Sequence, residues 1–317
     1  MRTKRVLICG ASGFIGRNLF EHFDSNGYET YGTYLKSRPQ VFNPKIIPVD
    51  LRDKYKALQI MQGMDIVINA AAMTAGIGVY SEETNAKEFV ETNNRINANL
   101  VESAHVNRVG HFVFLSCTIM YPSSIVPLKE NESDVDRVHP KYSVLAEIKI
   151  LGEEGCQYFA GMGSTKYTTV RHTNVYGPYD KFDLKHGHVL SATIEKVMTS
   201  QNNEIIVWGS GQESRDFLYI NDLIEFIRRA VNLQANNFEI FNVGSGKTYS
   251  INELVGVIIS HSGKELKVIH DLTKPSIETY MNIDAGKAKR LIGWQAKTNL
   301  NEGIRKTIEW YKKNHPH

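Results

Sequence analysis

Short apolar runs alternate with longer segments of helical spacing through the first half of the chain. Residues 6–9 are apolar at every position, which favours a strand buried on both faces of a sheet. Apolar residues then recur at helical spacing as far as Phe23. Further strands are expected at residues 29–34, 46–51, 65–72, 111–116 and 167–172, with helices at 85–107 and around 145–160. This order predicts an α/β fold of the Rossmann type with a doubly wound parallel sheet.

Three glycines separate the first expected strand from the first expected helix. A strand, a glycine turn and a helix N-terminus together form an anion site, because backbone N–H groups point at a phosphate and the helix dipole favours negative charge. Glycine fits where a side chain would block a pyrophosphate or hold the helix off the sheet. We therefore predict that a dinucleotide binds to this turn, through Gly10, Ser12, Gly13, Phe14, Ile15 and Gly16.

The ends of the next strands bear on the choice of cofactor. Sites that prefer NAD carry an acidic residue at the end of the second strand. Here Tyr34 stands at that place, followed by Lys36 and Arg38, two cations that could hold a 2′-phosphate. We predict NADP, with NAD possible, although solvated loop charges explain the two cations nearly as well. Later strand ends are expected to add Asp50, Leu51, Ala70, Ala71 and Ala72 to the cofactor site.

Composition narrows the class of protein. The 317 residues are 42% hydrophobic and 22% charged, which is typical of a globular protein. A net charge of +3 is too small to indicate a nucleic-acid or membrane-surface partner, and no apolar run is long enough to span a membrane. The three scattered cysteines predict a reducing, cytoplasmic location without disulfides or a metal centre. They are Cys9, Cys117 and Cys156.

Six motifs occur in an order that resembles one enzyme family. The chain is similar to the extended short-chain dehydrogenases/reductases of the NDP-sugar epimerase/dehydratase family. Within that family it most resembles the GDP-L-fucose synthase type, a 4-keto-6-deoxymannose epimerase/reductase. The motifs are Gly-Ala-Ser-Gly-Phe-Ile-Gly at 10–16, Ala-Ala-Met-Thr-Ala-Gly-Ile at 71–77, Phe-Leu-Ser-Cys-Thr-Ile-Met-Tyr-Pro at 114–122, Asn-Val-Tyr-Gly-Pro at 174–178, His-Val-Leu at 188–190 and Arg-Asp-Phe-Leu-Tyr at 215–219.

The resemblance implies a catalytic Ser or Thr together with a Tyr-x-x-x-Lys pair on one helix. In the family the Tyr exchanges a proton with the sugar, and the Lys holds the nicotinamide ribose and lowers the Tyr pKa. The motif selects Lys149 as this lysine, but the position four residues earlier holds Leu145, which cannot exchange a proton. Three explanations are open: Tyr142 reaches in from one turn away, His188 or a water serves instead, or the redox step is lost.

The Ser/Thr position also departs from the family pattern. It falls on Cys117, beside Ser116 and Thr118, and the cysteine that the fucose-synthase type uses for epimerisation is replaced by Ile119. Cys117 is explained at least as well by burial as by catalysis. His188 stands where the same type keeps its general acid, and histidine can transfer a proton near neutral pH. The predicted catalytic residues are therefore Lys149, His188, Cys117, Thr118 and Tyr142.

The second half is expected to hold the substrate. We predict a dinucleotide-binding domain at 1–178, with later returns to it near 216–245, and mostly a smaller α/β substrate-binding lobe at 179–317. The family turn at Asn174 and Val175 is expected to contact the nicotinamide. Trp208 could stack a base and Arg215 could pair with a diphosphate. The predicted substrate contacts are Ser116, Asn174, His188, Val189, Lys196, Trp208 and Arg215.

These features predict an NADP(H)-dependent oxidoreductase or epimerase of a nucleotide-linked sugar. The resemblance favours a GDP-linked 4-keto hexose, a role in making surface-polysaccharide precursors, and a homodimer. A nucleotide-sugar dehydratase is less favoured, because the Asp-Glu pair of those enzymes is replaced here by Thr118 and Ile119. A third hypothesis is a catalytically impaired protein that binds NADP and nucleotide sugars, and Leu145 supports it.

Overall fold

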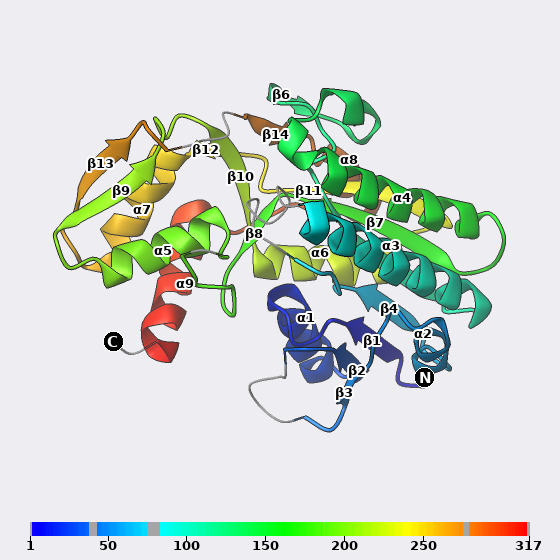
Figure 1. Cartoon of the computed structure of the whole chain (residues 1–317). Coiled ribbons are helices and arrows are strands. Elements are labelled where there is room, and N and C mark those ends of the chain that lie inside the picture. Colours follow the sequence, from blue (N-terminus) through cyan, green and yellow to red (C-terminus); the bar gives the residue numbers. More distant parts are fainter. Residues whose placement is uncertain (1, 38–42, 75–82, 185, 275–278, 316–317) are drawn as a thin grey trace.

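The centre of the molecule is a seven-stranded sheet in which every neighbouring pair of strands is parallel (Figure 1). The structure, a computed structural model, describes residues 2–37, 43–74, 83–184, 186–274 and 279–315. The sheet confirms the predicted α/β fold of the Rossmann type. In spatial order its strands are β11 (Phe238–Val243), β7 (Lys166–His172), β5 (His111–Cys117), β4 (Ile66–Asn69), β1 (Arg5–Cys9), β2 (Glu29–Tyr34) and β3 (Ile46–Pro48).

Helices cover both faces of this sheet, which explains why β1 is apolar at successive positions. Val6 and Ile8 point into one core cluster, with α1 (Phe14–Ser25) and α6 (Ile220–Leu233). Leu7 and Cys9 point into another, on the opposite face. A strand between two helical layers has no solvent face, so every side chain on it is buried. The helices of that opposite layer are α2 (Lys54–Ile60), α3 (Glu83–Val106) and α4 (Ser143–Ala160).

A second lobe lies at the left in Figure 1, beyond β8 (Asn174–Tyr176) and β10 (Ser214–Tyr219). Its helices α5 (Val189–Thr199), α7 (Ile251–Ser262) and α9 (Leu300–Asn314) pack together under the parallel pair of β9 (Glu204–Trp208) and β13 (Lys267–Asp271). The boundary expected at residue 178 stays a prediction; α6 and β11 follow it in sequence and lie in the layers of the central sheet.

The other elements of the described residues are β6 (Ser124–Leu128), β12 (Thr248–Ser250), β14 (Met281–Ile283), α8 (Gly286–Ile292) and short 3-10 turns at Glu130–Glu132, Val135–Arg137 and Pro140–Tyr142.

Two strands are shorter than the sequence pattern indicates. β3 ends at Pro48 rather than at residue 51, because Asp50 accepts from the backbone N–H of Arg52 and the chain turns into α2. Asp53 then caps α2 through its side chain. β4 ends at Asn69 rather than at residue 72, because the Asn69 side chain accepts from the backbone N–H of Ala71. In both places a polar side chain next to the strand end competes with strand pairing.

Among the residues that the structure describes, no helix is both long and apolar enough to cross a membrane.

One buried histidine links the stability of the sheet to pH. His111 begins β5 with 4% of its surface exposed, and its Nε2 lies 2.7 Å from Thr168 Oγ1. The Gln234 amide nitrogen donates to two backbone carbonyls, so the Gln234 oxygen takes the Thr168 hydroxyl proton and the His111 ring donates to Thr168. Burial, with Lys166 and Lys4 nearby, lowers the pKa of His111 to about 3.

We expect the free energy of unfolding to fall as the solution is acidified. The unfolded chain binds a proton at His111 near the ordinary pKa of about 6.5, whereas the folded chain binds it only near 3, so protons favour unfolding below about pH 6.5. The loss due to this residue between about pH 8 and about pH 5 is roughly 2 kcal/mol. Urea unfolding of the wild type and of His111→Gln, each at about pH 8 and about pH 5, measures this loss of unfolding free energy. The same loss in both proteins would contradict the assignment.

Candidate active site

The predicted cofactor turn joins β1 to α1 at the carboxyl edge of the sheet. Gly10 has a φ of +79°, in the left-handed region, and a Cβ there would lie 2.8 Å from the Ala70 carbonyl oxygen. A Cβ on Gly16 would lie 2.1 Å from the Gly10 carbonyl oxygen. The turn is therefore closed tightly on itself and on β4, and only glycine fits at these two positions.

The N-terminus of α1 is open to an anion. Gly13 is the N-cap residue and has no side chain to accept from the helix. The N–H groups of Phe14, Ile15 and Gly16 have no carbonyl one turn earlier in the helix to bond. A Cβ on Gly13 would meet only the Gly10 carbonyl oxygen, at 3.4 Å, so the turn leaves space for a ligand to approach the backbone. These features fit a pyrophosphate, as predicted from the glycine spacing.

The residues expected around the adenosine half are only partly described. Tyr34 ends β2 half-buried, and Lys36 after it is exposed. Arg38 lies outside the described residues. The Asp50 carboxylate pairs with Arg52 at 2.7 Å, and that hydrogen bond lowers the pKa of Asp50, so an adenine contact would have to share this carboxylate with Arg52. Leu51 is buried against α2 and α3, so it offers a ligand little more than its backbone.

Asparagines of α3 hold the loop that follows β4. Asn93 accepts from the backbone N–H of Met73 at 3.0 Å and donates to its carbonyl at 3.2 Å. Asn97 accepts from Asn69 at the end of β4. Ala70 and Ala71 are half-buried and Ala72 is exposed, so the predicted small-residue passage reaches the surface beside Gly10.

Helix α4 presents Lys149 to the carboxyl edge of the sheet. Its Nζ donates to the Leu115 carbonyl of β5 at 2.8 Å and lies 5.3 Å from the ring centroid of Phe114. Burial lowers the pKa of Lys149. One turn earlier on the same face stands the half-buried Leu145, which carries no polar atom. The helix therefore brings the predicted lysine to the site and brings no proton donor with it.

Tyr142 lies one turn before Leu145 at the start of α4. It is the last residue of the 3-10 turn Pro140–Tyr142 and the N-cap residue of α4. Burial raises the pKa of Tyr142, and the nearby Arg215 guanidinium opposes that rise. The structure therefore places Tyr142 near Arg215, the residue predicted to bind a diphosphate, and its catalytic role stays a prediction.

The end of β5 lies over a buried charged network. Glu153 of α4 pairs with Arg171 of β7 at 2.6 Å, and both side chains are 4% exposed. Ser116 donates to Glu153 at 2.6 Å and is fully buried, and its predicted contact with substrate stays a prediction. Its hydroxyl is used to satisfy a buried carboxylate. Tyr121 accepts from Arg171 at 2.9 Å and closes the network.

Cys117 and Thr118 follow directly at the carboxyl edge. Cys117 is half-buried, and burial raises the pKa of its thiol. Thr118 is buried, and its backbone carbonyl accepts from the N–H of Tyr121 in a tight turn. A thiol with a raised pKa stays protonated at neutral pH, which makes Cys117 a weak candidate for a proton acceptor.

His188 stands at the N-cap of α5 with its side chain exposed. Asp180 lies beside it, almost fully buried, and its Oδ2 has no hydrogen-bond partner among the described residues. Burial raises the pKa of Asp180, while the neighbouring His188 acts to lower it. The Asp180 carboxylate therefore offers a buried acceptor next to His188. The role of His188 as a general acid stays a prediction.

The other residues predicted to contact the substrate or the nicotinamide lie in the second lobe or just before it in the sequence. The Asn174 side chain donates to the Asp216 carbonyl, and Val175 next to it is buried. Trp208 is 51% exposed, with Lys196 Nζ 5.4 Å from its ring centroid, so its face is open to a planar group and close to a cation. Arg215 donates to the backbone carbonyls of Ser214 and Thr279. Val189 begins α5 beside His188, partly exposed.

One polar residue at the carboxyl edge, His172, is not among the residues predicted from the sequence. His172 is the last residue of β7 and lies opposite Cys117 in the register of β5 and β7. The available signal was a histidine at the end of an expected strand, directly before the Thr-Asn turn.

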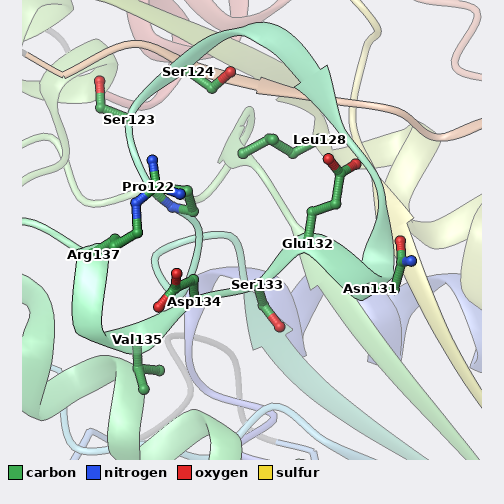
Figure 2. Close-up of a pocket in the computed structure, with 10 residues that line it drawn as sticks. All are labelled: Pro122, Ser123, Ser124, Leu128, Asn131, Glu132, Ser133, Asp134, Val135 and Arg137. Carbon is green, nitrogen blue, oxygen red and sulfur yellow. The ribbon is translucent and has the colours of Figure 1, made fainter.

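A cavity of the described residues is lined by none of the predicted site residues. Figure 2 shows a pocket of about 590 Å³ beside β6, between β5 and α4 in sequence. None of its lining residues is a predicted ligand, so it adds nothing to the site at the carboxyl edge. The lining residues are Pro122, Ser123, Ser124, Leu128, Asn131, Glu132, Ser133, Asp134, Val135 and Arg137.

Comparison with known proteins agrees with this geometry. Residues 6–244 match the NAD dependent epimerase/dehydratase family. GDP-L-colitose synthase of Yersinia pseudotuberculosis is 28% identical, with 97% of each chain covered. A putative GDP-L-fucose synthase 2 of Arabidopsis thaliana is 32% identical over 99% of this chain and 93% of its own. A UDP-glucose 4-epimerase of Thermotoga maritima, solved with UDP-glucose, shares the fold with a TM-score of 0.85 at 24% identity, covering 98% of this chain and 99% of that one.

Proposed function

Because the chain belongs to the NAD dependent epimerase/dehydratase family, we propose that it is an NADP(H)-dependent epimerase/reductase of a nucleotide-diphosphate sugar. The family resemblance inferred from the six motifs is thereby confirmed. Full-length similarity to a GDP-colitose synthase and a GDP-fucose synthase supports a GDP-linked 4-keto hexose as substrate. A place in making surface-polysaccharide precursors, in the cytoplasm, is also part of the proposal and rests on the family resemblance.

One observation carries this proposal. The open N-terminus of α1 and Lys149 of α4 both lie at the carboxyl edge of one parallel sheet. Ligands of doubly wound sheets bind at that edge. A bound nicotinamide dinucleotide would supply or take up a hydride there, with Gly10–Gly16 on its pyrophosphate and Lys149 on its nicotinamide ribose. The second lobe would hold the sugar nucleotide through Arg215, Trp208 and Lys196.

The absence of an acidic residue after β2 supports NADP over NAD. Lys36 stands exposed just beyond the strand end, where a carboxylate would otherwise bind the ribose hydroxyls. Arg38 would add a second cation to a 2′-phosphate site.

A homodimer is also part of the proposal. Helices α3 and α4 pack side by side on one face of the sheet. Their outer surface exposes large apolar side chains, which a second copy of the chain would cover. They are Val106, Leu151 and Tyr158.

Titration with the four nicotinamide dinucleotides, followed by turnover with GDP-linked 4-keto sugars, tests the function. We expect NADP(H) to bind more tightly than NAD(H), and a 4-keto sugar to oxidise NADPH steadily. Isotope exchange at the sugar ring without net oxidation would instead indicate an epimerase. Failure of every dinucleotide to bind would overturn the proposal.

Leu145 supports a second candidate function. In this alternative the protein binds cofactor and nucleotide sugar but does not catalyse their reaction. Its signature in the same assay is binding of NADP(H) and of GDP-sugar with no change in either. The dehydratase alternative predicts loss of water from a GDP-hexose without any added reductant.

A further inference from the structure

Three groups meet where β5 and β7 end side by side. Lys149 donates to the carbonyl of Leu115, two residues before the end of β5. Cys117, at that end, is paired in register with His172 at the end of β7. The Lys149 ammonium, the Cys117 thiol and the His172 ring therefore come from three elements to the same edge of the sheet, where the proposed function places the nicotinamide.

Hydrogen bonding fixes the tautomer of His172. Its Nδ1 lies 2.8 Å from the carbonyl oxygen of Thr173. A carbonyl only accepts, so Nδ1 carries a proton and the neutral ring has its lone pair on Nε2. Among the described residues, Nε2 has no hydrogen-bond partner. The side chain is partly exposed, and Nε2 is not among the unbonded polar atoms that are buried. It therefore reaches solvent as a free acceptor.

The charges around the ring keep it neutral at physiological pH. Burial, with the positive charges of Lys149 from α4 and His188 from the start of α5, lowers the pKa of His172 to about 4. The Cys117 thiol is paired with His172 in register from β5, and burial raises the pKa of that thiol, so it is protonated. The carboxylate of Asp180 acts on His188. A neutral ring accepts a proton, and its protonated form gives one up readily.

The other candidate groups are less well placed to replace the missing tyrosine. Leu145 has no polar atom, and Ser116 is buried against Glu153. Tyr142 lies at the N-terminus of α4 beside Arg215. His188 is the alternative proton donor; it begins α5, whereas His172 ends β7 at the edge of the sheet that Lys149 also reaches.

We propose that His172 transfers the proton of the sugar oxygen in this enzyme, in the role that tyrosine has elsewhere in the family; this inference rests on the proposed function. In the oxidising direction, Nε2 takes the hydroxyl proton while the C–H bond gives its hydride to an oxidised nicotinamide dinucleotide, and the C–O bond becomes a carbonyl. In the reducing direction, the imidazolium returns that proton to the carbonyl oxygen as a hydride arrives at carbon. The ring exchanges its proton with water through Nε2.

His172→Gln tests the assignment, because glutamine keeps a donor for the Thr173 carbonyl and a neutral side chain. We expect the single-turnover rate of sugar reduction to fall roughly 100-fold, while the dissociation constant for NADPH changes by less than about threefold. The wild-type rate should rise as pH falls from about 8 to about 6 because the protonated fraction of the ring grows, and His172→Gln should lose that dependence. His261→Gln changes a partly exposed histidine of α7 that bonds Asn301; it is the matched control and should behave as wild type.

A second variant guards against a purely structural effect. Leu145→Tyr in the His172→Gln background should restore at least about tenfold of the lost rate, since it places a phenol one turn before Lys149. A rate for His172→Gln above about half that of wild type would overturn the inference, as would parallel loss of NADPH binding and turnover. Absence of turnover or of dinucleotide binding in the wild type would instead be a failure of the proposed function, and is seen before any variant is made.

Discussion

Gly16→Ala is expected to weaken the binding of a nicotinamide dinucleotide by roughly 100-fold or more, which corresponds to at least about 2.7 kcal/mol. The new Cβ would lie 2.1 Å from the carbonyl oxygen and 2.7 Å from the carbonyl carbon of Gly10, and 3.1 Å from Cα of Ala11. All three are backbone atoms, so the clash cannot be relieved by rotating a side chain. The turn must open, and the N–H groups that α1 offers to a phosphate then lose their common direction. Fluorescence titration with NADPH measures the change.

Gly256→Ala is the matched control for this substitution. Gly256 lies within α7, and its Cβ would meet nothing within 4 Å. Alanine there should stabilise the fold by about 0.4–1 kcal/mol through the unfolded chain and leave NADPH binding unchanged. If Gly16→Ala binds NADPH as tightly as Gly256→Ala does, the glycine turn is not the pyrophosphate site.

Arg171→Met is expected to lower the free energy of unfolding by about 3–5 kcal/mol. The substitution leaves the Glu153 carboxylate buried without its cation, since both side chains are 4% exposed and the Ser116 hydroxyl is then its one remaining neighbour in the network. Tyr121 loses its donor as well. Urea unfolding followed by circular dichroism measures the loss.

The double variant Arg171→Met/Glu153→Leu distinguishes two causes of the lost stability: the loss of the ion pair itself, and the burial of an unpaired Glu153 carboxylate. Removing both charges should recover a good part of the stability, because an apolar pair of similar volume need not be desolvated. A single variant within about 1 kcal/mol of wild type would show that the pair contributes little. A double variant that is less stable than Arg171→Met would show that the pair itself, rather than the unpaired carboxylate, supplies the stability.

The network also explains how a stability residue affects the site. Arg171 and Ser116 directly precede His172 and Cys117 on neighbouring strands. Successive side chains along a strand point to opposite faces of the sheet. Arg171 and Ser116 therefore take part in the buried network, and the side chains of His172 and Cys117 are left outside it at the carboxyl edge. Mispairing of Glu153 is therefore expected to move the proposed proton-transfer group as well as to destabilise the sheet.

Sequence by itself determined the features that depend on local chemistry. The parallel sheet follows from apolar runs such as that of β1, and the glycine turn follows from a spacing that places three residues without side chains at a helix start. Lys149 and Leu145 share a helix face because a four-residue spacing fixes it. These inferences needed no knowledge of which distant segments meet.

Only the tertiary structure decided which polar groups are free and which are already used. Ser116 has the chemistry of a site residue, but its hydroxyl donates to the buried carboxylate of Glu153, 37 positions away in the sequence. The local signal of His172, a histidine at the end of an expected strand, does not show which groups lie around it, since these follow from the pairing of β5 with β7 and the packing of α4 on both. Hydrogen-bond partners far apart in sequence are chosen by the fold, and a pattern along the chain carries no record of that choice.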